Sequence, residues 1–294
     1  SRLTKVTLSF LPLLIGQVFC GYSLLKKHTS TAWRETASVF LFFAIGASIS
    51  LIAQVYNIPG DLDSFIITWM LLSLPLVYVL QSSIVSLLYI AGITYYGCNV
   101  NYFTYPSTHS FLYWLLLLGV FPHYYQLVKT KGLGNFTLFH HWFLALSIVI
   151  CLGTITNKNK DLVYLSYMSL FTIFYFFGNT PFFDKQKLKN NSFLIVGKLG
   201  ILYLLLLYSF KWFWDSSIYK TTSLSETLLS IEFISALLLT FLAVILFYKK
   251  NSKTNFKDVS LLELVFLTNI LFFIAGYEFS ILANTIVLFI GISE

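Results

Sequence analysis

The chain has 294 residues, of which 57% are hydrophobic and only 11% are charged, and its formal net charge is +7. A soluble domain usually carries about 25% charged residues, so this composition excludes a water-soluble globule. The basic residues fall in short clusters between apolar runs, as topology signals do, and they form no long basic stripe. We therefore exclude nucleic acid as a partner and expect a lipid bilayer to surround most of the chain.

Eleven apolar stretches follow one another along the chain, and we expect each to cross the membrane as a helix. They lie at about 6–25, 36–56, 65–80, 83–97, 110–127, 139–155, 161–177, 193–210, 227–248, 260–274 and 279–292. Only Gln81 and Ser82 join the third and fourth stretches, so a re-entrant hairpin is an alternative for this pair. The predicted fold class is all-α, a polytopic integral membrane helical bundle of about 11 short transmembrane helices. We expect a single transmembrane domain over 1–294 and no soluble domain.

The basic residues also predict how the helices are oriented. If the spans alternate in direction, 13 of the 19 Lys and Arg residues fall on one face and 6 on the other. By the positive-inside rule the richer face is cytoplasmic. The chain then starts outside and its C-terminus is cytoplasmic, which fits a bacterial cytoplasmic membrane. The first residue is Ser1 rather than Met, and we expect the chain to be a piece of a longer protein.

A specific signature occupies the second and third spans. A Gln-aliphatic-Tyr motif ends the second span, a Gly-Asp turn follows, and the third span contains Trp and Pro. These positions are Gln54-Val55-Tyr56, Gly60-Asp61, Trp69 and Pro75, preceded by Trp33-Arg34-Glu35. Over about residues 22–90 the chain resembles a bacterial family of predicted membrane proteins, domain-of-unknown-function family 2157. That family has no established activity, so the resemblance implies membrane architecture and leaves the function open. Many members have His after the Tyr, whereas this chain has Asn57, so no imidazole role is carried over.

Polar residues at the outer end of the second span form the first candidate site. Gly46, Ser50 and Gln54 recur every four residues, and Asn57 follows, so they share one stripe of a helix. Small and polar residues in such a stripe also suit helix packing. One interpretation is therefore a packing seam that ends in a capped turn. The other is an outward-facing polar pocket that binds a cation, a proton or a lipid-linked sugar.

Two carboxylates extend this candidate site. Asp61 and Asp63 lie in the turn that follows the stripe. Asp63 is also suited to cap the third span, whereas in the pocket interpretation either carboxylate holds the ligand. No ligand set for a metal ion is predicted, and no cofactor is expected.

Three further charged residues lie within or near apolar spans. Glu232 is predicted about two turns into the ninth span, where a carboxyl group is costly unless it is paired, protonated or in contact with water. It either reaches the outer interface or carries a proton. Lys198 and Glu263 are each predicted about one turn inside the cytoplasmic face. They either form an intramembrane ion pair or extend separately to the interface.

Three histidines, His123, His140 and His141, flank the predicted cytoplasmic loop between the fifth and sixth spans. Three imidazoles can in principle bind zinc. Adjacent helical residues point in different directions, however, and no carboxylate or cysteine is close in the sequence. We therefore interpret them as interfacial histidines and predict no metal site.

Two functions fit this pattern. The first is a transporter-like or scaffolding membrane component that works with other membrane subunits, with Gln54, Asn57, Asp61 and Glu232 lining an outward site. The alternative is an integral membrane enzyme that acts on lipid-linked substrates, similar to polytopic glycosyltransferases. It would use Asp61 or Asp63 as a base or metal ligand in an early outer loop. The short outer loops and the absence of a recognisable catalytic motif favour a protein that is not an enzyme.

Overall fold

The computed structural model describes residues 2–103, 111–132, 134–155, 160–183, 187–210, 213 and 230–251. All regular secondary structure within these ranges is helical. The chain folds into two compact units, Ser1–Ser147 and Ile148–Glu294. We call them unit 1 and unit 2 and describe each by itself. The single transmembrane domain stays a prediction.

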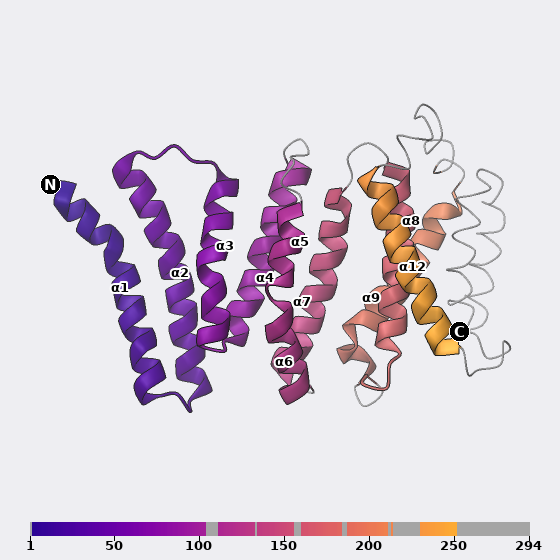
Figure 1. Ribbon diagram of the computed structural model, residues 1–294, viewed down its shortest axis with the longest axis horizontal. Coiled ribbons are helices and arrows are strands. Elements are labelled where there is room, and N and C mark those ends of the chain that lie inside the picture. Colours follow the sequence, from indigo (N-terminus) through magenta and orange to yellow (C-terminus); the bar gives the residue numbers. More distant parts are fainter. Residues whose placement is uncertain are drawn as a thin grey trace. The chain divides into compact units, whose positions relative to one another are not determined.

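The helices of both units are shown in Figure 1. Unit 1 contains α1 (Arg2–Lys26), α2 (Thr31–Tyr56), α3 (Leu62–Val79), α4 (Ser83–Cys98), the π-helical turn η1 (Asn99–Phe103), α5 (Phe111–Leu118), α6 (Phe121–Lys131) and most of α7 (Asn135–Leu152). Unit 2 continues with the short 3-10 turn η2 (Gly153–Ile155), α8 (Lys160–Gly178), the second 3-10 turn η3 (Leu188–Asn190), α9 (Ser192–Tyr208) and α12 (Ile231–Asn251).

The described residues contain seven helical segments that are long and apolar enough to cross a membrane. They are Val6–Lys26, Thr31–Tyr56, Leu62–Val79, Ser83–Tyr102, Phe111–Lys131, Asn135–Ile155 and Ile231–Lys250. Two apolar helices, Val163–Gly178 and Ser192–Tyr208, are shorter. These nine segments correspond to the first nine predicted spans. The last two, at 260–274 and 279–292, lie outside the described residues, so the total of about 11 stays a prediction.

Polar residues define where the helices begin and end. The Asp61 carboxylate accepts a hydrogen bond of 2.7 Å from the Ser64 backbone N–H and so caps α3. Ser82 caps α4 in the same way, because its hydroxyl accepts from the Val85 backbone N–H at 3.2 Å. The cap of α3 is thus Asp61 and not the predicted Asp63, which lies one residue inside the helix.

Helix α2 and helix α3 pack closely where a glycine faces a tryptophan. A Cβ atom added to Gly46 would lie 2.7 Å from Cε2 of the Trp69 ring. The Trp69 indole N–H donates to the Phe42 carbonyl oxygen of α2 at 2.8 Å. The predicted packing seam therefore exists at its Gly46 end, where the missing side chain makes room for the indole.

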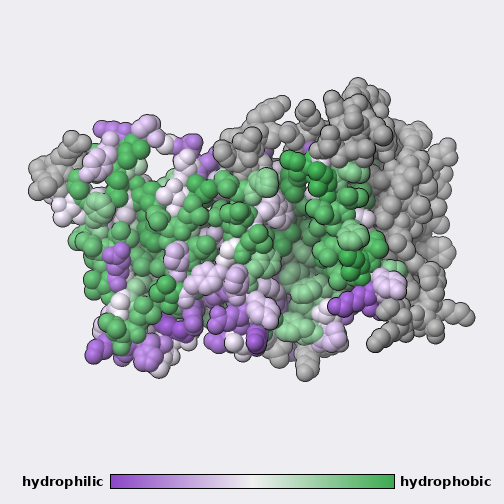
Figure 2. All heavy atoms as spheres, in the orientation of Figure 1, coloured by the Kyte–Doolittle hydropathy of each residue, from purple (hydrophilic) through white to green (hydrophobic). Residues whose placement is uncertain are grey.

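The surface of unit 1 follows the pattern expected in a bilayer. Hydrophobic residues cover the middle of α1 to α3, and hydrophilic residues gather toward the two ends of these helices (Figure 2). Exposed apolar side chains on α1 include Leu14, Val18 and Leu25. Such a surface is costly in water and suits contact with lipid.

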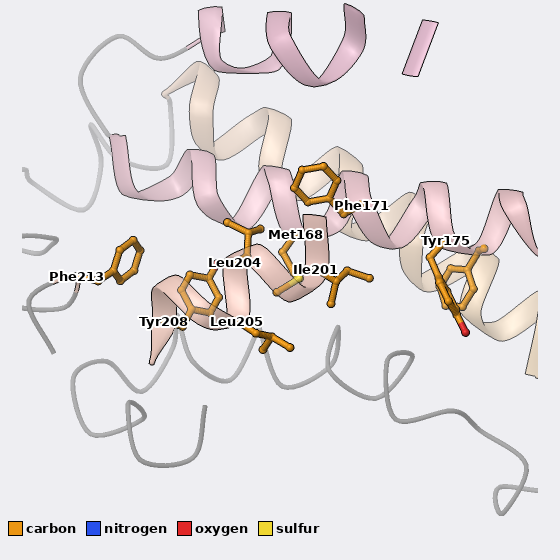
Figure 3. Packing of buried hydrophobic residues seen from close by; sticks show 9 residues of the cluster. Met168, Phe171, Tyr175, Ile201, Leu204, Leu205, Tyr208 and Phe213 are labelled. Atoms are coloured by element: carbon orange, nitrogen blue, oxygen red, sulfur yellow. The ribbon is translucent and has the colours of Figure 1, made fainter. Parts of the chain in front are cut away.

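Unit 2 has its own apolar core between α8 and α9. Met168, Phe171 and Tyr175 on α8 pack with Ile201 and with other apolar residues of α9, as Figure 3 shows. Close approach of the two helices depends on glycines of α9, since a Cβ atom at position 200 would lie 2.3 Å from the Phe171 ring. Helix α12 joins α8 through a hydrogen bond of 2.9 Å between the hydroxyls of Ser169 and Thr240.

Candidate functional site

The residues predicted to form an outer pocket lie around the loop between α2 and α3. Gln54, Asn57 and Asp61 are exposed, and Asp63 is half-buried. Asn57 ends α2 with a left-handed backbone, φ 50° and ψ 43°, a conformation that Asn tolerates better than most residues.

Each aspartate of this loop has a hydrogen-bond partner. The Ser64 backbone N–H donates to Asp61, and this bond holds the pKa of the carboxyl below its ordinary value. The Asn99 side-chain amide donates to the Asp63 carboxylate at 2.5 Å. Gln54, Asn57, Asp61 and Asp63 all lie at or near this loop. Asn57 ends α2, and Asp61 caps the start of α3.

Glu232 belongs to unit 2 and is 2% exposed. Helix α12 begins at Ile231, so Glu232 lies in its first turn and not two turns inside, as the sequence had predicted. A carboxylate is favourable at this end of a helix because of the helix dipole. Lys198 is half-buried on α9. Its predicted partner Glu263 lies outside the described residues, so that ion pair stays a prediction.

The most buried acidic group of unit 1 is Glu35, in the first turns of α2, with 7% of its surface exposed. Its Oε1 atom accepts from the Ser83 backbone N–H at 2.9 Å, and Oε2 accepts from the Ile84 N–H at 3.0 Å. The Ser82 hydroxyl also donates to Oε2. Glu35 thus binds the N-terminus of α4 from a different helix, where backbone donors and the helix dipole favour an anion.

Two histidines of α6 and α7 lie in the interior of the same unit. His123 is 6% exposed and His140 is 0% exposed, and their ring centroids are 5.9 Å apart. His140 Nδ1 is 2.7 Å from the Phe136 carbonyl oxygen, so this nitrogen donates its proton. His140 Nε2 then accepts from the Ser86 hydroxyl at 3.0 Å. Both nitrogens of His140 are therefore engaged.

The imidazole of His123 differs from that of His140. Its Nε2 atom is buried and has no hydrogen-bond partner in the described structure. The ring lies edge-on to Tyr78 of α3, with ring centroids 6.4 Å apart. His123, His140 and His141 are all buried in the protein interior, and their predicted position at the membrane interface stays a prediction. Tertiary packing buries them although they flank a loop.

A helix interruption lies next to His123. Within the span Phe111–Lys131, α5 ends at Leu118 and α6 begins at Phe121. Pro122 has no N–H, so the Leu118 carbonyl loses its usual helical donor four residues later. Two tyrosine hydroxyls reach this region: Tyr78 donates to the Gly119 carbonyl, and Tyr89 donates to the Leu116 carbonyl at 3.3 Å.

These groups form one polar region, which we call the Glu35–His123 region and define as Glu35, Ser82, Ser83, Ser86, His123 and His140. It contains a carboxylate with several donors and a buried imidazole nitrogen with none. Such groups can bind and release a proton. Among the described residues no group of three or more His, Cys, Asp or Glu side chains is arranged to hold a metal ion.

The sequence contained signals for this region that hydropathy does not use. In the sequence, Glu35 is recognisable only as part of the basic turn before the second predicted span. Gly119 and Pro122 lie inside the predicted span 110–127, and a proline within an apolar helix signals a break. The pairing of Glu35 with Ser83 joins residues 48 positions apart, which no local pattern reveals.

Comparisons with known proteins support the membrane assignment and add no activity. None of the curated proteins and none of the solved structures compared with the chain matches it. Residues 1–86 match the family of predicted membrane proteins DUF2157, which confirms the resemblance found in the sequence. The matched residues form α1, α2, α3 and the start of α4, and they include Glu35 and its hydrogen-bond partners at the N-terminus of α4.

Proposed function

We propose that the protein is a transporter-like component of a bacterial cytoplasmic membrane and that its polar pathway runs through unit 1. The observation that carries this proposal is the interruption between α5 and α6 within an apolar span. Backbone groups without helical partners are costly in a bilayer and are tolerated only inside protein or next to a water-filled cavity. Transporters use such discontinuous helices to bind substrates and coupling ions.

The two polar ends of α2 give this pathway a direction. Glu35 and Gln54 are 19 positions apart on one helix, which corresponds to roughly 28 Å at 1.5 Å per residue. This length is close to the roughly 30 Å hydrocarbon thickness of a bilayer. In the proposal, Gln54, Asn57 and Asp61 form the outer entrance, and the Glu35–His123 region lies toward the cytoplasmic face.

The distribution of basic residues supports this orientation. The end of unit 1 where α2 begins and α6 ends (Figure 1) carries five basic residues: Lys26, Lys27, Arg34, Lys129 and Lys131. Basic residues prefer the cytoplasmic side. The C-terminus is then cytoplasmic if the remaining spans alternate.

The enzyme alternative needs Asp61 or Asp63 as a base or metal ligand. Asp61 accepts the Ser64 N–H as a helix cap, and Asp63 accepts the Asn99 amide. The partners in these two bonds, a backbone N–H and a side-chain amide, are not catalytic acids or bases. No specific observation in the described residues favours the enzyme, so we do not propose it.

The test is an ion-flux assay with the full chain in liposomes. Entrapped indicators report the entry of protons, sodium or chloride after a gradient is imposed. We expect at least one of these ions to enter faster than in protein-free liposomes. Gly119→Leu should reduce that flux about tenfold, because its side chain would fill the interruption beside Leu74. Ala47→Leu, at an exposed position of α2, is the matched control and should leave the flux unchanged.

Flux no faster than in protein-free liposomes for all three ions would overturn the transporter proposal. In that case the scaffolding function, with other membrane subunits as partners, would replace it. Equal flux in Gly119→Leu and wild type would show that the interruption does not line the pathway.

A further inference from the structure

The Nε2 atom of His123 is a buried polar atom without a partner in the part of the chain that the structure describes. Nearly all buried polar atoms in proteins form hydrogen bonds, and an exception indicates a bound species or a functional role. His123 is the third residue of α6, which begins directly after the helix interruption, so a charge on this ring lies close to the break in the span.

The Glu35 carboxylate has the capacity to accept one more hydrogen bond. A carboxylate offers about four lone-pair sites, two on each oxygen. The Oε2 atom accepts from Ser82 and Ile84, whereas Oε1 accepts only from Ser83. One lone pair of Oε1 therefore has no donor among the described residues. Ser83, which donates to Oε1, lies about one turn before Ser86 in α4, and the Ser86 hydroxyl bonds to His140, whose ring lies beside His123.

A metal ion fits this region poorly. The nearest second imidazole, His140, uses Nδ1 for the Phe136 carbonyl and Nε2 for the Ser86 hydroxyl. Metal binding would require His140 to give up one of these bonds. A zinc ion needs about four ligands, and the described residues provide no such set.

We propose that His123 is a buried proton-binding site beside the interruption between α5 and α6, in the same polar region as Glu35. When a proton binds, the lone pair of His123 Nε2 forms an N–H bond, and the ring becomes a cation in the region that contains the Glu35 carboxylate. On release the proton leaves Nε2 and the neutral ring returns. The inference rests on the proposed function only for the use of this proton in transport.

Other titratable groups surround His123 on several helices. Tyr78 of α3 contacts the ring edge, and His140 of α7 lies beside it. On α6 itself, Tyr124 stacks on His140 and lies edge-on to His141. None of these groups carries a negative charge at neutral pH, and Arg34, next to Glu35 in α2, is a cation. Glu35 is thus the acidic group of the Glu35–His123 region, and its negative charge favours a charged imidazole there.

The test is a nuclear magnetic resonance titration of the full chain in lipid nanodiscs. Histidine and glutamate carry isotope labels, and His123→Gln identifies the His123 signal. We expect this signal to change from the neutral to the charged form within about pH 4.5–8.5. In Glu35→Gln the midpoint should move down by about one pH unit or more, because the anion of the same polar region is removed. Asp61→Asn, which removes a carboxylate at the other end of α2, should leave the midpoint unchanged.

A second measurement avoids any folding defect of Glu35→Gln. In the wild-type protein, the carboxyl signal of Glu35 should shift with the same midpoint as the His123 signal. A His123 ring that stays neutral over the whole range overturns the proposal, and so does a Glu35 signal that does not follow the ring. Titration of the pair without ion flux in liposomes would leave the proton site standing and overturn the transporter function.

Discussion

The carboxylate of Glu35 in α2 accepts a hydrogen bond of 2.9 Å from the backbone N–H of Ser83, the first residue of α4. This bond joins α2 to the N-terminus of α4. Glu35→Ala would leave the Ser83 and Ile84 donors buried without partners. We expect it to lower the free energy of unfolding by about 3 kcal/mol. Glu35→Gln keeps one acceptor oxygen and should cost about 1–2 kcal/mol. Unfolding in denaturant, followed by circular dichroism, measures both.

Thr36→Ala is the control for this prediction, since Thr36 is the next residue of α2 and is exposed. It should change the free energy of unfolding by less than about 0.5 kcal/mol. Equal stability of Glu35→Ala and Thr36→Ala would contradict the role of Glu35 at the start of α4.

Gly46→Ala tests the contact between α2 and α3. The new methyl group would lie 2.7 Å from the Trp69 ring, so the ring must move and its hydrogen bond to the Phe42 carbonyl must stretch. We expect a loss of about 1–3 kcal/mol in the free energy of unfolding. Gly46→Ala combined with Trp69→Phe should lose less than the sum of the two single changes. Strictly additive losses would show that the two residues do not interact.

Gly46 and Glu35 also show what a single sequence can predict about this fold. The stripe through Gly46 was recognisable as a packing seam because helical periodicity is local. The nine apolar segments in the described part of the chain were predictable for the same reason, since each is a continuous run of apolar residues. Hydropathy does not report which polar residues meet across helices. The sequence therefore does not reveal the region formed by Glu35, His123 and His140. It points instead to Asn57 and Asp61, whose structural roles are to end α2 and to begin α3.

Asn57 ends α2 in the left-handed region, and its substitutions should follow backbone preference. Asn57→Gly adopts φ 50° at no steric cost and should keep the free energy of unfolding within about 0.5 kcal/mol of wild type. Asn57→Val, with a branched Cβ, should lose about 1–2 kcal/mol. The measurement is the same denaturant unfolding. Equal stability of the glycine and valine variants would exclude a backbone role for position 57.

The cap of α3 by Asp61 should depend on pH. Hydrogen bonding from Ser64 keeps the pKa of Asp61 below its ordinary value. A lowered pKa in the folded state means that the cap stabilises the protein above the unfolded-state pKa. This stabilisation is lost as the pH falls through the folded-state pKa. Asp61→Asn also caps a helix but does not titrate. The difference in melting temperature between wild type and Asp61→Asn should therefore shrink as the pH falls from about 5 to about 2. A constant difference would contradict the cap.

The apolar part of helix α8 is short for a membrane span, and labelling decides whether the helix crosses. At about 1.5 Å per residue, Val163–Gly178 extends for roughly 24 Å, less than the roughly 30 Å of the hydrocarbon core. Alternation of the spans nevertheless places Lys189, after α8, on the same side as Lys129 and opposite to Gly60. The side of each position can be measured with single cysteines at these three exposed positions, in a chain whose native cysteines are replaced. A membrane-impermeant maleimide labels only the cysteines that it can reach. We expect Gly60→Cys to be labelled from outside intact cells, and Lys129→Cys and Lys189→Cys only after the membrane is opened. Outside labelling of Lys189→Cys together with Gly60→Cys would mean that α8 does not cross. Outside labelling of Lys129→Cys would instead reverse the orientation of unit 1, and the Glu35–His123 region would then face the exterior.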